Sequence, residues 1–257
     1  MTPGVSALGD TVAIVTGASS GIGEATALAL AGEGATVALV ARRAERLDEL
    51  AGRIAADAPQ PLVVAADLTD PAQPQRVMDE VVANAGRIDI LVNNAGVMLL
   101  GPVVGAPLDE WERMLDINVR ALLRCAHAAL PHLVEAAAQG PRHVADMVNV
   151  SSVAGRTATA GAGVYNLTKW GVGAFSESLR QEVARRQVRV GLIEPGATAT
   201  ELAGHNRPEI RETMSQRFAG VQFMEAADIA DAIRYMVTRP SHVAVNEMLV
   251  RPASQER

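Results

Sequence analysis

The chain has 257 residues, 49% of them hydrophobic, and carries a formal net charge of −6. This length and apolar content suffice for one large core, and no break in composition indicates a second domain. The negative charge argues against nucleic-acid binding, which requires a basic face. With no charged leader, no membrane-length apolar run and only one cysteine, Cys125, the sequence predicts a cytoplasmic protein without an internal disulfide.

Short β-branched runs alternate with helical patterns, as in a parallel α/β sheet. In the first half we expect strands at residues 11–15, 36–40, 61–65 and 88–92, and helices ending near residue 33 and spanning 44–56, 71–85 and 109–133. In the second half we expect strands at 144–150, 188–193 and 243–250, a helix carrying Tyr165, and a helix at 226–237. Residues 199–224 have weak periodicity, so we expect an irregular loop that acts as a substrate lid.

A glycine-rich turn follows the first expected strand, with the sequence Thr16-Gly17-Ala18-Ser19-Ser20-Gly21-Ile22-Gly23. Glycines let main-chain N–H groups approach a phosphate closely, and the positive end of the next helix adds to the attraction. The spacing differs from the G-x-G-x-x-G fingerprint, so an ordinary strand-to-helix turn is an alternative. Its position directly after the first strand favours a dinucleotide site.

The second expected strand ends at Arg42 and Arg43, where folds that bind NAD usually place an acid for the adenosine ribose. A carboxylate would repel a 2′-phosphate, whereas guanidinium groups bind phosphate with two hydrogen bonds. The arginine pair therefore favours NADP over NAD. The alternative is that both arginines are only the solvated start of a helix, although cations oppose the helix dipole there.

Polar residues also follow the fourth and fifth strands, at the edge where open α/β sheets bind ligands. The fourth strand runs into Asn93-Asn94-Ala95-Gly96, and the fifth into Ser151-Ser152. Asn118 lies on an otherwise apolar helix and requires polar partners. It therefore either serves the site or only caps a neighbouring carbonyl.

Lys169 is the only lysine in the chain, and it follows Tyr165 by four residues. On a helix these two side chains share a face, and a nearby cation favours the ionised form of a phenol. The pair is therefore suited to exchanging a proton near neutral pH, which predicts an acid–base function.

In order and spacing, these motifs and Pro195-Gly196 resemble the short-chain dehydrogenase/reductase family over nearly the whole chain. The resemblance implies a single-domain Rossmann fold over residues 1–257, with a doubly wound, seven-stranded parallel sheet and helices on both faces. It further implies an NADP(H)-dependent oxidoreductase that interconverts a carbonyl and an alcohol. In that family pattern Tyr165 is the acid/base, Ser152 binds the substrate oxygen, Lys169 lowers the pKa of the phenol and holds the nicotinamide ribose, and Asn118 anchors a water relay.

The resemblance also implies a set of residues that contact the NADP(H) cofactor. They are Gly17, Ser19, Ser20, Gly21, Ile22, Gly23, Arg42, Arg43, Asp67, Leu68, Asn94, Ala95, Gly96, Tyr165, Lys169, Pro195, Gly196, Thr198 and Thr200. No metal, nucleic acid or membrane partner is implied. The residues 96–102, the arginine pair and the ending at residues 246–252 look like one NADP-dependent branch, which includes the reductase that forms clavulanic acid and dehydrogenases of short 3-hydroxy acids. The ending departs from the Asp-Gly-Gly tail common in other branches.

The family pattern implies a homotetramer in which the helices bearing Asn118 and Tyr165 pack against a second subunit. Small residues would permit close approach there, namely Ala162, Gly171, Gly173 and Ala174. The alternative is that these residues pack only against their own sheet.

Two other classes of protein share some of these motifs. A catalytically silent NADP-binding sensor would have the same glycine turn and sheet, but the intact Ser152, Tyr165 and Lys169 argue against it. Epimerases and dehydratases that share Tyr-x-x-x-Lys need a sizeable C-terminal domain, for which little chain remains.

Arg156 follows Ser152 closely, so we expect it at the mouth of the site as a ligand for a substrate carboxylate. A solvated loop arginine is the alternative. Three arginines of the expected lid compete for the same function, namely Arg207, Arg211 and Arg217.

Overall fold

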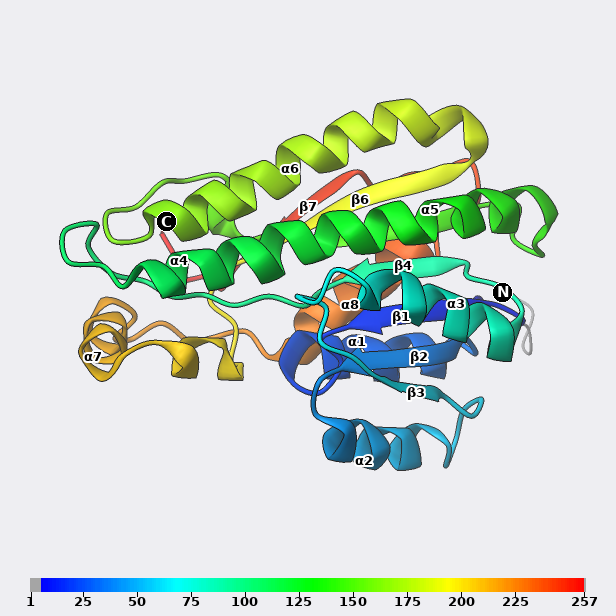
Figure 1. Cartoon of the computed structure of the whole chain (residues 1–257), viewed down its shortest axis with the longest axis horizontal. Coiled ribbons are helices and arrows are strands. Elements are labelled where there is room, and N and C mark those ends of the chain that lie inside the picture. Colours follow the sequence, from blue (N-terminus) through cyan, green and yellow to red (C-terminus); the bar gives the residue numbers. More distant parts are fainter. Residues whose placement is uncertain (1–5, 257) are drawn as a thin grey trace.

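The structure is a computed structural model that describes residues 6–256. Its centre is a parallel sheet in the order β3-β2-β1-β4-β5-β6-β7 (Figure 1). The strands are β1 (Val12–Thr16), β2 (Thr36–Ala41), β3 (Leu62–Ala65), β4 (Ile90–Asn93), β5 (Ala145–Val150), β6 (Val188–Pro195) and β7 (Glu247–Val250). The winding reverses between the neighbouring strands β1 and β4, as in a doubly wound Rossmann fold.

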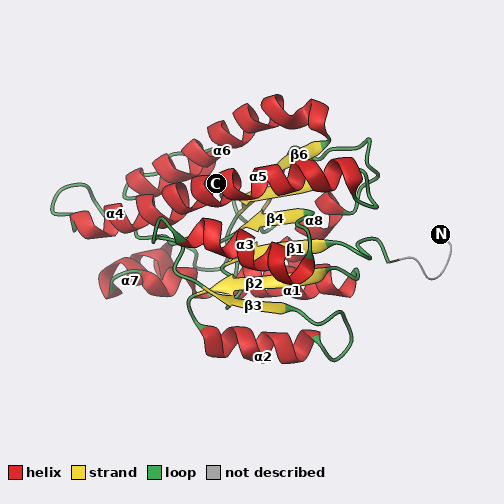
Figure 2. Ribbon diagram, turned by 45° about the vertical axis from the view of Figure 1, so that its right-hand side comes forward, coloured by secondary structure: helices red, strands yellow, loops and turns green. Residues whose placement is uncertain are grey.

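Helices cover both faces of this sheet (Figure 2). One face carries α1 (Gly21–Gly32), α2 (Ala44–Ile54) and α8 (Ala226–Val237), and the other carries α3 (Gln73–Ala85), α5 (Leu122–Gln139) and α6 (Gly163–Val183). In β1, Val12 and Ile14 pack toward α3 and α5, whereas Ala13 and Val15 pack toward α1 and α8. Because both faces are buried, the strand is a continuous apolar run rather than an alternating one.

The expected strands and helices are confirmed, with three corrections. The 199–224 segment is not irregular throughout, because it contains the 3-10 helix η4 (Glu201–His205) and the α-helix α7 (Pro208–Arg217). No residue of α7 is buried, so the helix has no apolar periodicity to reveal it. The last strand is shorter than the expected 243–250, since the carbonyl of Val243 bonds Arg189 instead of a neighbouring strand.

The expected helix at 109–133 is longer and has an interruption. It comprises α4 (Leu108–Leu115), a π-helical turn η1 (Asp116–Ala121) and then α5. Asn118 lies within the π-helical turn, a local distortion that often occurs at functional sites. Within residues 6–256, no helix combines the length and apolarity needed to span a bilayer.

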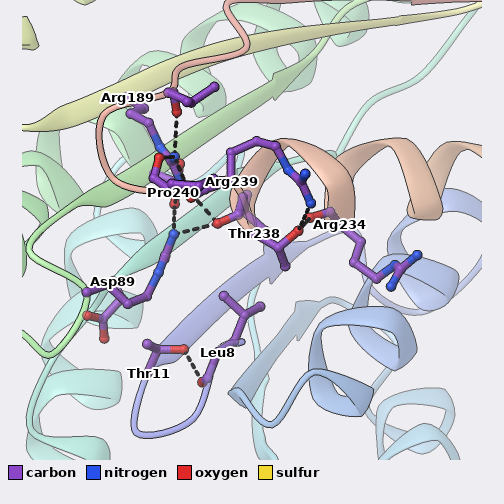
Figure 3. Close-up of polar contacts among 12 residues, drawn as sticks. Leu8, Thr11, Asp89, Arg189, Arg234, Thr238, Arg239 and Pro240 are labelled. Carbon is purple, nitrogen blue, oxygen red and sulfur yellow. Dashed lines mark hydrogen bonds and ion pairs between the residues drawn. The ribbon is translucent and has the colours of Figure 1, made fainter. Parts of the chain in front are cut away.

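A buried ion network holds the amino-terminal ends of β5 and β6, at the edge of the sheet opposite the ligand-binding edge. Arg189 donates to both carboxylate oxygens of Asp146, at 2.7 and 3.0 Å. It also donates to the main-chain carbonyls of Val237, Arg239, Pro240 and Val243 (Figure 3). Arg142 donates to Asp146 at 2.7 Å. The network therefore ties the end of α8 and the start of the last connection to the sheet.

Candidate active site

A cleft of about 1200 Å³ lies at the carboxyl ends of the strands, between the glycine turn, the start of α6 and the segment 198–224. It extends from Arg42 and Asp67 at one end to Ser152 and Tyr165. All of the predicted catalytic and cofactor residues line it, except Gly23 and Asn118. The fold therefore brings together residues that follow six of the strands and residues of α6.

The glycine turn has main-chain conformations and close contacts that only glycine accommodates without strain. Gly17 and Gly21 have φ angles of 68° and 56°, in the left-handed region. Gly23 does not line the cleft, because its role is packing: a Cβ there would collide with the carbonyl oxygen of Gly17 and the amide of Asn94. Asn94 in turn donates to the carbonyl of Thr16 at 2.9 Å, which joins the two turns that flank the cleft.

One end of the cleft is cationic. The Arg43 guanidinium donates to the hydroxyls of Ser19 and Ser20, at 3.0 and 2.8 Å, and forms an ion pair with Glu201 at 2.9 Å. Arg42 lines the same end, and among the described residues it has no ion pair within 4.0 Å. The pKa of Asp67 is lowered, chiefly by a hydrogen bond from Thr69 and to a smaller extent by Arg42.

The other end contains the predicted acid. Tyr165 is only 6% exposed although it lines the cleft. Burial raises the pKa of its phenol to about 12, and a hydrogen bond with Ser152 partly offsets that rise. Ser152 caps the short 3-10 turn η2 (Val153–Gly155), since its hydroxyl accepts from the N–H of Ala154 at 3.1 Å. The phenol is therefore neutral at physiological pH.

Lys169 is buried one turn along α6 from Tyr165. Its ammonium lies 5.8 Å from the centroid of the Tyr165 ring and donates to the carbonyl of Val150 at 2.9 Å. Burial lowers the pKa of Lys169 to about 8. The pKa of the phenol is raised overall because desolvation of Tyr165 outweighs the hydrogen bond with Ser152, and the stabilisation of a phenolate by Lys169 stays a prediction.

Asn118 does not line the cleft, and its side chain bonds the main chain of Val97, which does. Its amide accepts from the N–H of Val97 and donates to the carbonyl of Val97, both at 2.8 Å. It also donates to the hydroxyl of Thr168 at 3.2 Å, the residue before Lys169. The side chain therefore fixes the irregular segment that follows β4 against α6. These contacts fit a positioning residue and include a capped carbonyl, as the alternative predicted, and the water relay stays a prediction.

Arg156 does not line the cleft. Its Nε lies 2.8 Å from both carboxylate oxygens of Glu194, and it also pairs with Glu247. These two acids raise the pKa of Arg156 and offset its charge, so the expected carboxylate ligand is wrong. Arg156 is an exposed turn residue, which agrees with the solvated-loop alternative, although it is also ion-paired. Of the competing arginines, Arg211 and Arg217 line the cleft.

Sequence reasoning missed the residues that hold the 198–224 segment over the cleft. Asn206 is buried, accepts from the N–H of Leu100 at 2.7 Å and donates to the carbonyl of Met98 at 3.0 Å. Glu201 pairs with Arg43 and with Arg46, the latter at 2.6 Å. Their partners lie 106 to 158 residues away in the sequence, so no local pattern marks them.

The profile of the short chain dehydrogenase family matches residues 11–211. The chain belongs to this family. The short-chain dehydrogenases are oxidoreductases, and the chain is an NAD(P)-dependent enzyme of that class. It is 38% identical over 241 residues to an uncharacterized oxidoreductase of Staphylococcus epidermidis, and the match covers 94% of this chain and 96% of the relative.

Glycine betaine reductase of Emericella nidulans is also 38% identical, over 244 residues and 95% of this chain. The chain spans only 19% of the length of that reductase. Among solved structures, the closed form of serine dehydrogenase complexed with NADP⁺ has a TM-score of 0.87 at 30% identity, covering 96% of this chain and 97% of that one. A 3-ketoacyl-(acyl-carrier-protein) reductase from Brucella melitensis, complexed with NADH, has a TM-score of 0.83 at 28% identity, covering 96% and 98%.

Proposed function

We propose that this short-chain dehydrogenase is an NADP(H)-dependent oxidoreductase that interconverts an aldehyde or ketone and an alcohol, with Tyr165 as the acid/base. The observation that carries the proposal is one cleft with a buried, neutral phenol beside Ser152 at one end and an arginine pair at the other. Consumption of NADPH with a panel of aldehydes and ketones tests it. Turnover of any member supports the proposal, and binding of NADPH without turnover of any supports the silent sensor instead.

The residues of the cleft fit the cofactor. Arg42 and Arg43 would bind the 2′-phosphate, and the left-handed turn at Gly17 and Gly21 leaves room for the pyrophosphate. Lys169, Thr198 and Thr200 would hold the nicotinamide half. When bound, reduced nicotinamide supplies hydride to the carbonyl carbon.

The chain's own residues would stabilise the substrate oxygen and deliver the proton. The hydroxyls of Ser152 and Tyr165 would both donate to the carbonyl oxygen, where negative charge develops. Because the pKa of Tyr165 is about 12, its phenol holds a proton until that charge appears and then releases it. The nearby ammonium of Lys169 would stabilise the resulting phenolate, and Asn118 keeps α6 in place.

NADP preference rests on the arginine pair, since solved relatives bind either NADP⁺ or NADH. We expect Arg42→Ala to weaken the binding of NADPH by roughly tenfold or more and to change the binding of NADH little, because only NADPH carries the 2′-phosphate. Dissociation constants from fluorescence titration measure this. Arg53→Ala is the matched control, since Arg53 pairs with Glu24 outside the cleft. Equal weakening of both cofactors, or a wild-type preference for NADH, would contradict NADP preference.

The pH dependence of kcat/KM should follow the ionisation of the Lys169 ammonium. Its pKa is lowered to about 8, so the ammonium is charged below pH 8 and neutral above it, whereas the phenol of Tyr165 keeps its proton. We expect kcat/KM for carbonyl reduction to be level between about pH 6 and 7.5 and to fall about tenfold per unit above pH 8. A level profile up to pH 9.5 would show that the charge of Lys169 is not required.

We infer a homotetramer that packs through α6. Leu167, Trp170, Gly171 and Ala174 share one face of this helix, and all are exposed, Leu167 by 62% and Trp170 by 52%. Gly173 instead faces Leu192 of its own sheet. Light scattering should give a tetramer mass for the wild type and a smaller mass for Trp170→Glu. The control is Asp48→Lys, at an exposed position of α2. A wild-type monomer at micromolar concentration would contradict this inference.

The segment 199–224 is proposed as the substrate lid, because Asn206 joins it to the apolar wall at Met98 and Leu100. The cytoplasmic location and the resemblance to the clavulanate branch stay predictions.

A further inference from the structure

At the cationic end of the cleft, the carboxylate of Glu201 forms ion pairs with two arginines. Its Oε2 lies 2.9 Å from Nη1 of Arg43 and its Oε1 lies 2.6 Å from Nη1 of Arg46. These two cations lower the pKa of Glu201 to about 2, so the carboxylate is charged at any physiological pH. Glu201 is the first residue of η4, at the start of the proposed lid. Arg43 directly precedes α2, and Arg46 lies in the first turn of that helix.

All three nitrogens of the Arg43 guanidinium have partners. Nε bonds the hydroxyl of Ser19, Nη2 bonds the hydroxyl of Ser20 and the carbonyl of Ser19, and Nη1 bonds Glu201. The two serines are hydroxyl donors or acceptors that can also bond a phosphate, but Glu201 only accepts and carries negative charge. A 2′-phosphate that binds Arg43 would therefore lie close to the Glu201 carboxylate, which is paired with the same guanidinium. The two negative charges would repel each other.

We propose that Glu201 is a specificity-determining residue that competes with the 2′-phosphate of the cofactor for Arg43. Binding of NADPH would release the lid's first turn from Arg43, while Arg46 retains Glu201 nearby. NADH has no 2′-phosphate and leaves the Glu201–Arg43 pair intact. Glu201 therefore limits the preference for NADPH that the arginine pair provides. The inference rests on the proposed use of NADP(H).

The decisive variant is Glu201→Gln, which keeps the shape of the side chain and removes its charge. Adenosine 2′,5′-bisphosphate and AMP are the probes, because they differ in the 2′-phosphate and need no turnover. Isothermal titration at low salt should show bisphosphate binding about fivefold tighter in the variant and AMP binding unchanged, since one exposed ion pair contributes about 1 kcal/mol or less. The gain should shrink at 0.5 M salt, because screening weakens the repulsion.

Glu209→Gln is the matched control: Glu209 is another lid glutamate, it pairs with Arg207, and it does not line the cleft. Weaker bisphosphate binding in Glu201→Gln would show that Glu201 orients Arg43 rather than competing with phosphate, and that result overturns the proposal. Equal changes for both probes would show a general loosening of the lid and also overturn it. Failure of NADP preference itself appears separately, as equal loss of NADPH and NADH in Arg42→Ala.

Discussion

Tyr165→Phe should lower kcat for carbonyl reduction by about 10²–10⁴-fold while NADPH binding stays nearly unchanged. The substitution removes only the phenolic hydroxyl, and the ring still packs in one apolar cluster with Val97, Leu99 and Met114. No other group of the described chain stands beside Ser152 with a proton held at a pKa of about 12. Steady-state kinetics and a fluorescence titration of NADPH, run on the same preparation, measure the two quantities.

The other tyrosine of the chain provides the matched control. Tyr235 is 48% exposed and lies on α8, away from the cleft, so Tyr235→Phe should keep wild-type kinetics. Residual activity of Tyr165→Phe within tenfold of wild type is a barrier change under about 1.4 kcal/mol, and it would exclude Tyr165 as the acid.

The second large effect concerns stability rather than chemistry. Arg189→Met should lower the free energy of unfolding by about 3–5 kcal/mol, because it leaves the buried carboxylate of Asp146 with Arg142 as its remaining partner. It also removes a donor from four main-chain carbonyls, of which Val237 keeps Arg142 and Pro240 keeps the N–H of Val243. The side chain is 9% exposed, so solvent cannot replace these contacts readily. Urea unfolding at one fixed protein concentration measures the loss.

An exposed ion pair serves as the comparison. Arg180 pairs with Glu177 one turn away on the surface of α6, and Arg180→Met should lower the free energy of unfolding much less than Arg189→Met, because solvent screens the pair. The kcat of folded Arg189→Met should equal that of the wild type, since the network lies at the opposite edge of the sheet from the cleft. A loss under 1 kcal/mol would mean that the buried pair contributes no more than a surface pair.

The features predicted from sequence are those that local chemistry encodes. The turn at Gly17 and Gly21 needs positive φ, which marks glycine in the sequence, and the four-residue spacing of Tyr165 and Lys169 fixes a shared helical face. The seven strands were recognisable because buried parallel strands are short continuous apolar runs.

The features missed depend on tertiary contacts. The pairing of Arg156 with Glu194 and Glu247 removed it from the cleft, and neither acid is near it in sequence. The raised pKa of Tyr165 is a consequence of burial, which the spacing to Lys169 does not reveal. Glu201 and Asn206 function through contacts with distant segments. Helix α7 buries no residue, so its sequence lacks an apolar period.

The central claim is that this cleft reduces a carbonyl with NADPH by using Tyr165. The most direct measurement is the fate of deuterium from NADPH labelled at C4 of the nicotinamide, followed by mass spectrometry of the product alcohol. Wild type should place one deuterium on the carbinol carbon of a reduced aldehyde or ketone, and Tyr165→Phe, although it binds the labelled cofactor, should form almost no labelled alcohol. Labelled alcohol at wild-type rates from Tyr165→Phe, or none from wild type with any carbonyl tested, would contradict the account.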